Sequence, residues 1–226
     1  FDMHPILYQA YYNFDHYDKL EGGCIPYNNM ENLTPNLREY PMWKTLHTKH
    51  KGSKVHWGLL SWRWRDKTGI EAAVFKQWII DNPGYDVYHI DPFKFTNKQY
   101  NNLWVQGGQW VVGMLDFARI LFPKLGITTP PENIIYSNEQ WLTCNYYVGN
   151  TVFWDGWMEF LEKSLEICYA EPRLKYYLLE AYGIGPLYNG KPVPNFPFVV
   201  ERLSSLYVYM NSNIKVKSYY GDELNA

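Results

Sequence analysis

Residues 55–71 decide the fold, and they read Val55-His56-Trp57-Gly58-Leu59-Leu60-Ser61-Trp62-Arg63-Trp64-Arg65-Asp66-Lys67-Thr68-Gly69-Ile70-Glu71. The run over 55–61 is apolar, as is typical of a buried strand. A basic, aromatic loop over 62–69 follows, and a helical pattern comes after it. Thr68 and Glu71 have the spacing of a capping box, which predicts that a helix begins at Thr68.

This loop and the predicted helix start have the chemistry of an anion site. Free N–H groups at a helix N-terminus and the helix dipole both attract negative charge. Basic side chains directly upstream would add charge-assisted hydrogen bonds to a phosphate. We therefore predict a phosphate site made by Arg63, Arg65, Lys67 and Thr68. In the alternative interpretation, the arginines pair with surface carboxylates and the tryptophans pack over a sheet edge.

Strand and helix patterns alternate along the rest of the chain. Apolar runs predict further strands over 5–12, 85–91, 141–148 and 214–219. Spacings of three and four residues predict amphipathic helices after Thr68, before Pro123, over 151–169 and 173–182, and from about Pro197 to Met210. Strands separated by helices favour an α/β fold with a mostly parallel central sheet flanked by helices, in a single domain covering 1–226. Residues 21–41 and 183–197 are predicted to be long loops.

Composition narrows the classes of function. The 226 residues carry a net charge of only -2, so we expect no nucleic-acid partner. Aromatic residues make up 19% of the chain and offer flat surfaces on which sugar rings can stack. Three cysteines without a C-x-x-C spacing favour a reducing compartment, so we expect a cytoplasmic location. The sequence has no run of about 18 apolar residues, so we predict no transmembrane segment in it.

A second informative stretch covers residues 82–93, where a turn leads into a short strand that ends at Asp91 and is stopped by Pro92. A carboxylate at the carboxyl end of a strand is well placed to hold a divalent metal or a ribose hydroxyl. Asp before Pro is also a common turn former. His89 would lie on the same strand face as Asp91, either as a core residue or as a ligand. A right-handed crossover would bring the strand ends at Ser61 and Asp91 to one sheet edge.

Three stretches carry a resemblance to known enzymes. Residues 84–93 resemble the strand that bears the acidic motif in sugar-nucleotide-dependent glycosyltransferases of the GT-A type. Residues 144–150 and 198–203 resemble the C-terminal half of capsular-polysaccharide glycosyltransferases, which have a Cys/Tyr-Asn-apolar strand, a helix, and a Phe-x-x-Glu-Arg-Leu helix before a last strand. The matches touch about half of the chain. His89 replaces the first acidic residue of the usual Asp-x-Asp, so Asp91 alone remains to hold a metal.

The resemblance implies a GT-A-like fold and transfer of a sugar from a nucleotide-diphosphate donor to a glycan acceptor, in the synthesis of surface polysaccharide or glycoprotein glycans. It implies that the predicted phosphate site binds the donor diphosphate and that Asp91 holds the ribose or an Mn²⁺ or Mg²⁺ ion. It also implies that the nucleotide base faces the end of the first strand, at Gln9, Tyr11 and Tyr12.

Further residues are candidates for catalysis and for binding the acceptor. Glu201 is a candidate general base, because glycosyl transfer needs a carboxylate that deprotonates the acceptor hydroxyl. It could equally cap the N-terminus of its own helix. Sugar or acceptor binding is predicted for Trp62, Trp104, Gln106, Trp110 and Asn145. Residues 104–110 could also form a tight turn between two helices.

Two other classes of function stay open. A noncatalytic carbohydrate-binding or glycan-assembly module, attached to additional transferase domains in a longer chain, would explain the aromatic surplus, the missing Asp-x-Asp and the start at Phe1. A sugar-phosphate hydrolase would use the acidic residues with a metal. Phosphate-binding P-loops, dinucleotide fingerprints and hydrolase nucleophile elbows are absent from the sequence, so those classes are not predicted.

Overall fold

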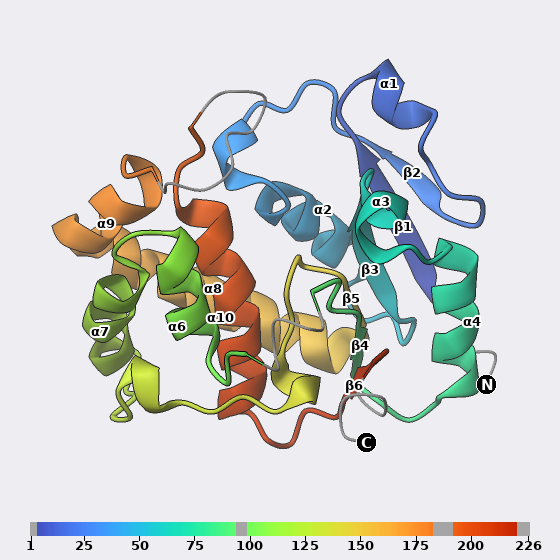
Figure 1. The fold of residues 1–226 in the computed structure, drawn as a ribbon. Coiled ribbons are helices and arrows are strands. Elements are labelled where there is room, and N and C mark those ends of the chain that lie inside the picture. Colours follow the sequence, from blue (N-terminus) through green and yellow to red (C-terminus); the bar gives the residue numbers. More distant parts are fainter. Residues whose placement is uncertain (1–3, 94–98, 183–191, 221–226) are drawn as a thin grey trace.

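The computed structural model describes residues 4–93, 99–182 and 192–220, and in them a six-stranded sheet separates two groups of helices (Figure 1). The strand order is β2-β1-β3-β5-β4-β6. The strands are β1 (Ile6–Tyr11), β2 (Ile25–Asn28), β3 (Trp57–Ser61), β4 (Val87–His89), β5 (Tyr147–Gly149) and β6 (Val216–Ser218). The predicted α/β class is therefore confirmed.

The sheet is mixed, so the prediction of a mostly parallel sheet is wrong. β5 runs antiparallel to both of its neighbours, β3 and β4, whereas the other pairings are parallel. The chain leaves β4 and re-enters the sheet at the same edge, where Ile90 N donates to Tyr146 O at 3.1 Å. β5 therefore has to run back along β4. A short buried strand has the same apolar pattern in either direction, so the sequence did not indicate this reversal.

Helices cover both faces of the sheet. The α-helices are α1 (Phe14–Tyr17), α2 (Tyr40–His50), α3 (Trp64–Thr68), α4 (Ala72–Asp81), α6 (Leu103–Trp110), α7 (Met114–Lys124), α8 (Thr151–Ala170), α9 (Pro172–Leu179) and α10 (Phe196–Met210). Short 3₁₀-helices occur at Pro35–Leu37, Pro131–Asn133 and Asn138–Gln140. No helix in the described part of the chain is long and apolar enough to cross a lipid bilayer.

Two hydrophobic cores lie on opposite faces of the sheet. Leu60 and Tyr88 point into a smaller core that is closed by α3 and α4. Their strand neighbours Leu59 and Val87 point into the larger core, which contains side chains from α2 and from α6 to α10. Successive strand residues face opposite sides. Burial on both sides explains why the strands appear in the sequence as continuous apolar runs.

Most of the predicted helices are present, while several other predictions fail. α7, α8, α9 and α10 match the predicted ranges closely, and Pro197 lies in the first turn of α10 as expected. Of the strand predicted over 141–148, only its end belongs to β5. The loop predicted over 21–41 contains β2, an exposed edge strand with Pro26 inside it. Part of the second predicted loop, 183–191, lies outside the described residues.

Candidate functional site

Polar side chains gather where β3 and β4 end and β5 begins. β3 and β4 point the same way with β5 between them, so the prediction that their carboxyl ends share one sheet edge is confirmed. Ser61 Oγ lies 2.6 Å from the Tyr146 hydroxyl across this edge. The Asp91 carboxylate accepts hydrogen bonds from Thr143 Oγ1 and from Phe93 N. Ligands of open α/β sheets bind at such an edge.

The predicted helix start at Thr68 is wrong. Residues 64–68 form α3, and Gly69, with φ +69°, ends that helix in the left-handed conformation that glycine adopts without strain. Thr68 Oγ1 donates to Trp64 O at 2.9 Å and accepts from Ile70 N at 3.2 Å. α4 begins only at Ala72. Gly69 was the sequence signal that a helix ends here rather than begins.

A carboxylate of the chain itself occupies the N-terminus of α4. Glu21 accepts a hydrogen bond from Ala72 N at 3.2 Å and pairs with Arg65 at 3.0 Å. Arg65 also pairs with Glu71 at 3.0 Å. For Arg65, the structure therefore agrees with the alternative interpretation, in which the basic residues pair with carboxylates. Glu21 supplies the negative charge that the sequence analysis had assigned to a phosphate.

Lys67 extends in another direction, because residues two apart on a helix face different sides. Its Nζ lies 3.7 Å from Cys144 Sγ and 5.7 Å from the centre of the Tyr146 ring. Burial disfavours the charged form of Lys67, but Coulombic interactions with Cys144, Tyr146 and Glu201 outweigh it and raise the pKa. Lys67 is thus a cation at the sheet edge. Arg63 is exposed, with its guanidinium 5.9 Å from the centre of the Trp62 ring.

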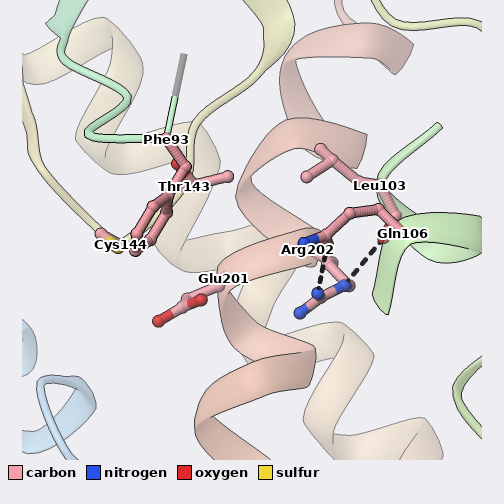
Figure 2. A pocket seen from close by; sticks show the side chains of 7 residues that line it. All are labelled: Phe93, Leu103, Gln106, Thr143, Cys144, Glu201 and Arg202. Carbon is pink, nitrogen blue, oxygen red and sulfur yellow. Dashed lines mark hydrogen bonds between the residues drawn. The ribbon is translucent and has the colours of Figure 1, made fainter. Parts of the chain in front are cut away.

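A small pocket of about 70 Å³ opens beside this edge (Figure 2). Its walls come from the segment after β4, the segment before β5, and helices α6 and α10. The lining residues are Phe93, Leu103, Gln106, Thr143, Cys144, Glu201 and Arg202. Glu201 and Gln106, two predicted site residues that lie far apart in the sequence, are therefore brought together. Asp91 adjoins the pocket through its hydrogen bond to Thr143.

Glu201 is the carboxylate of the pocket. It is the sixth residue of α10, so it lies beyond the first turn in which it could serve the helix N-terminus. Burial raises its pKa, Lys67 and Arg202 oppose that rise, and Glu39 and Asp91 reinforce it. Among the described residues, no group donates a hydrogen bond to the carboxylate. Its oxygens are therefore available to a ligand.

Arg202 fixes the pocket wall, and the sequence analysis did not identify it. Its guanidinium is buried and donates to Leu103 O at 2.9 Å, Phe198 O at 2.6 Å and Gln106 Oε1 at 2.8 Å. Figure 2 shows Glu201 and Arg202 pointing away from each other, with Arg202 reaching toward α6. A Cβ at Gly107 would lie 2.7 Å from Arg202 Cζ, so the glycine permits the close approach of α6. In the sequence, Gly107 and Arg202 lie far apart, so no local pattern indicated this contact.

The residues predicted to face the nucleotide base lie near the end of β1 and have different surroundings. Gln9 is fully buried, donating to Ser61 O at 3.1 Å and accepting from Glu21 N at 2.7 Å, so both ends of its amide are occupied. The Tyr11 ring lies edge-on to Tyr17 at 5.3 Å. Tyr12 lies edge-on to His16 at 6.0 Å.

The predicted sugar-binding residues separate into buried and exposed ones. Trp104 is fully buried and donates from Nε1 to the Tyr136 hydroxyl at 3.0 Å, so neither face of its ring is open to a sugar. Trp62 is partly exposed, and His16 is stacked on its ring at 3.7 Å. Asn145 is buried with φ +60°. Trp110 is 60% exposed, at the end of α6.

The described residues do not form a metal site of protein ligands alone. Within 4–93, 99–182 and 192–220, no three His, Cys, Asp or Glu side chains gather in a way that could hold a metal. His89, predicted to share a strand face with Asp91, is buried at the end of β4, and its ring forms a 2.8 Å hydrogen bond with Glu139 O. Burial lowers the pKa of His89 to about 4, so it is neutral near pH 7. These observations describe His89 as a core residue.

Comparisons of the whole chain with protein-family models, with curated proteins and with solved structures found no match. The arguments for function therefore rest on the geometry of the sheet edge and its pocket.

Proposed function

We propose that this protein is a glycosyltransferase that moves a sugar from a nucleotide-diphosphate donor to a glycan acceptor. The single observation that carries the proposal is the meeting of a carboxylate and a cation at the carboxyl edge of the sheet. Glu201, from α10, lines the pocket together with Cys144, and Lys67 Nζ, from α3, lies 3.7 Å from Cys144 Sγ. The charges of Glu201 and Lys67 also shift each other's pKa. Asp91, which follows β4, adds a second carboxylate nearby.

Glu201 has the properties of the general base in this proposal. Burial raises its pKa toward the operating range, which makes it a stronger proton acceptor than an exposed glutamate, while Lys67 keeps the ionised form accessible. Its carboxylate takes the proton of an acceptor hydroxyl. The hydroxyl oxygen bonds to the anomeric carbon of the donor sugar, and the bond from that carbon to the diphosphate breaks.

Lys67 stabilises the departing diphosphate in this proposal. A positive charge held in place before the reaction stabilises the negative charge that develops on the leaving oxygen. Arg65 is assigned no role in catalysis, because it is paired with Glu21 and Glu71. Asp91 would hold the ribose or a divalent ion, and such an ion would offset negative charge on the donor phosphates. The nucleotide base of the donor would lie over the aromatic surface at the end of β1, around Tyr12 and Trp62.

We also propose that the fold is GT-A-like. The stretch that resembles the acidic-motif strand forms β4, and Asp91 lies just past its carboxyl end. The C-terminal elements follow one another as β5, α8, α10 and β6, with α9 between the two long helices, and this agrees with the order that the resemblance implies. A mixed sheet with helices on both faces supports the same proposal.

Titration with a panel of nucleotide sugars, followed by calorimetry and thermal shift, tests the donor site. We expect at least one nucleoside-diphosphate sugar to bind the wild-type protein. Lys67→Met should weaken that binding about tenfold or more, because it removes the cation from the leaving group. Arg65→Met is the matched control, a neighbouring basic residue on α3 that should leave donor affinity unchanged. No response to any nucleotide sugar, or equal losses in both variants, would refute the donor site.

A noncatalytic carbohydrate-binding module is the second candidate, and the size of the pocket favours it. About 70 Å³ is well below the roughly 300 Å³ at which ligand pockets for small molecules begin. In the transferase proposal, this pocket holds only the reacting hydroxyl and its neighbours. Glycan binding that persists without nucleotide and survives Asp91→Ala would favour the binding module instead.

A further inference from the structure

Helix α6 places two of the predicted sugar-binding residues on one face. Gln106 and Trp110 are four residues apart, so they lie on the same side of the helix. One helical turn, about 5.4 Å along the axis, separates such residues. This is comparable to the length of one pyranose unit in a glycan chain.

The amide of Gln106 is oriented for a ligand. Its oxygen accepts from Arg202 Nη2 at 2.8 Å, and this bond determines which way the amide is turned. The amide nitrogen keeps two hydrogens to donate, and no acceptor for them occurs among the residues that the structure describes. Figure 2 shows the side chain reaching from α6 across to Arg202, in the wall of the pocket that also contains Glu201.

Trp110 is the exposed aromatic residue next along this face. It is 60% exposed, whereas Trp104 on the same helix is fully buried. A single exposed apolar side chain is ordinary on a protein surface. Trp110 differs in its position, because it lies one turn from an amide that is held ready to donate beside the candidate base. An indole ring and an amide donor together suit the apolar face and the hydroxyl groups of a sugar.

We propose that the acceptor is an oligosaccharide of at least two sugar units, which runs along α6 from Gln106 to Trp110. This inference rests on the proposed function and names the class of acceptor for the same site. The reacting unit presents its hydroxyl to Glu201 and receives a hydrogen bond from Gln106. The next unit stacks on Trp110. Trp110 is not among the residues that line the pocket, so in this proposal a single sugar held there leaves Trp110 unused and Trp110 selects for chain length.

Glycan binding as a function of chain length tests this inference. The probes are cello-, chito- and galacto-oligosaccharides of one to four units, titrated by calorimetry and by saturation-transfer NMR. In at least one series, we expect affinity to rise about tenfold or more from one unit to two. Trp110→Ala should abolish that increase, because the second unit loses its stacking surface. Phe14→Ala, which removes an aromatic side chain that is 76% exposed on α1, is the matched control and should keep the increase.

Several results would overturn the inference. These are an affinity that does not depend on chain length, an increase that survives in Trp110→Ala, and a lack of binding by every oligosaccharide. Titration of the same samples with nucleotide sugars separates this failure from failure of the proposed function. Donor binding without chain-length dependence refutes only the oligosaccharide acceptor. Chain-length dependence without donor binding refutes the transferase and leaves Trp110 as part of a glycan-binding surface.

Discussion

Replacing Gly107 with alanine tests the contact between α6 and α10 that forms the pocket wall. The new methyl group would lie 2.7 Å from Arg202 Cζ and closer still to Nε. Arg202 is buried and held by hydrogen bonds to Leu103 O, Phe198 O and Gln106 Oε1. The guanidinium therefore has to move, and its bonds to α6 are the ones that break.

The expected loss is large for a single methyl group. A hydrogen bond to a charged group contributes about 1.5–3 kcal/mol, and breaking two of them leaves a buried guanidinium with fewer partners. Alanine is favoured over glycine in a helix by about 0.5–1 kcal/mol, which offsets part of this loss. We expect Gly107→Ala to lower the free energy of unfolding by about 2–5 kcal/mol, a substantial share of the roughly 5–15 kcal/mol typical of a domain.

Urea denaturation of two matched variants provides the assay. At Gly108, the nearest atoms to a new Cβ belong to Leu115, at 3.9 Å, so alanine there meets only ordinary contact. Gly108→Ala should therefore leave stability unchanged or raise it by about 0.5–1 kcal/mol, from helix preference alone. If Gly107→Ala proved as stable as Gly108→Ala, the close approach of α6 to Arg202, and with it this account of the pocket wall, would be refuted.

Three further predictions concern charged groups. Burial raises the pKa of Glu201. A raised folded-state pKa stabilises the folded protein at low pH, and this stabilisation is lost as pH rises through the folded pKa. The free energy of unfolding, measured at pH 4 and pH 8, should therefore show Glu201→Gln gaining stability relative to wild type at the higher pH, and a difference that does not change with pH would contradict this. Burial lowers the pKa of His89 to about 4. The neutral ring therefore contributes about 3 kcal/mol to the free energy of unfolding above pH 6.5, and this contribution is lost as pH falls toward 4. NMR titration of the ring should show the lowered pKa, and titration near the ordinary histidine pKa would contradict the prediction. Glu21→Ala should cost about 1–3 kcal/mol, because it uncaps α4 and removes one of the two carboxylates paired with Arg65. Glu71→Ala removes the other carboxylate, whose side chain is 57% exposed, and should cost under about 1 kcal/mol; equal costs in thermal unfolding would argue against the capping role.

The sequence predicted the elements with strong local signals. α8 and α10 were predicted closely because their apolar residues recur at helical spacing, and because Pro197 marks the start of α10. β1 and β3 were predicted because both faces of these strands are buried. β2 was missed because an exposed edge strand needs no apolar run, and Pro26 inside it argues against a strand.

The rest depended on contacts between distant segments. The helix N-terminus at Ala72 is occupied by Glu21, which lies 51 residues earlier in the chain, and no local pattern indicates such a contact. Arg65 and Lys67 looked equivalent in a loop, but α3 directs them to different sides. Gln9 and Trp104 had the right chemistry for ligand binding, yet folding uses their polar groups internally. Glu201 and Gln106 line the same pocket although they lie far apart in the sequence, and Arg202 holds Gln106 there by a hydrogen bond.

Release of nucleoside diphosphate is the most direct test of glycosyl transfer at this pocket. Wild-type protein and Glu201→Gln would each be incubated with the nucleotide-sugar panel and the oligosaccharide probes. The account predicts acceptor-dependent release by the wild-type protein, and its loss in Glu201→Gln although that variant still binds the donor. Undiminished release by Glu201→Gln, or no release from any donor and acceptor pair, would contradict the account.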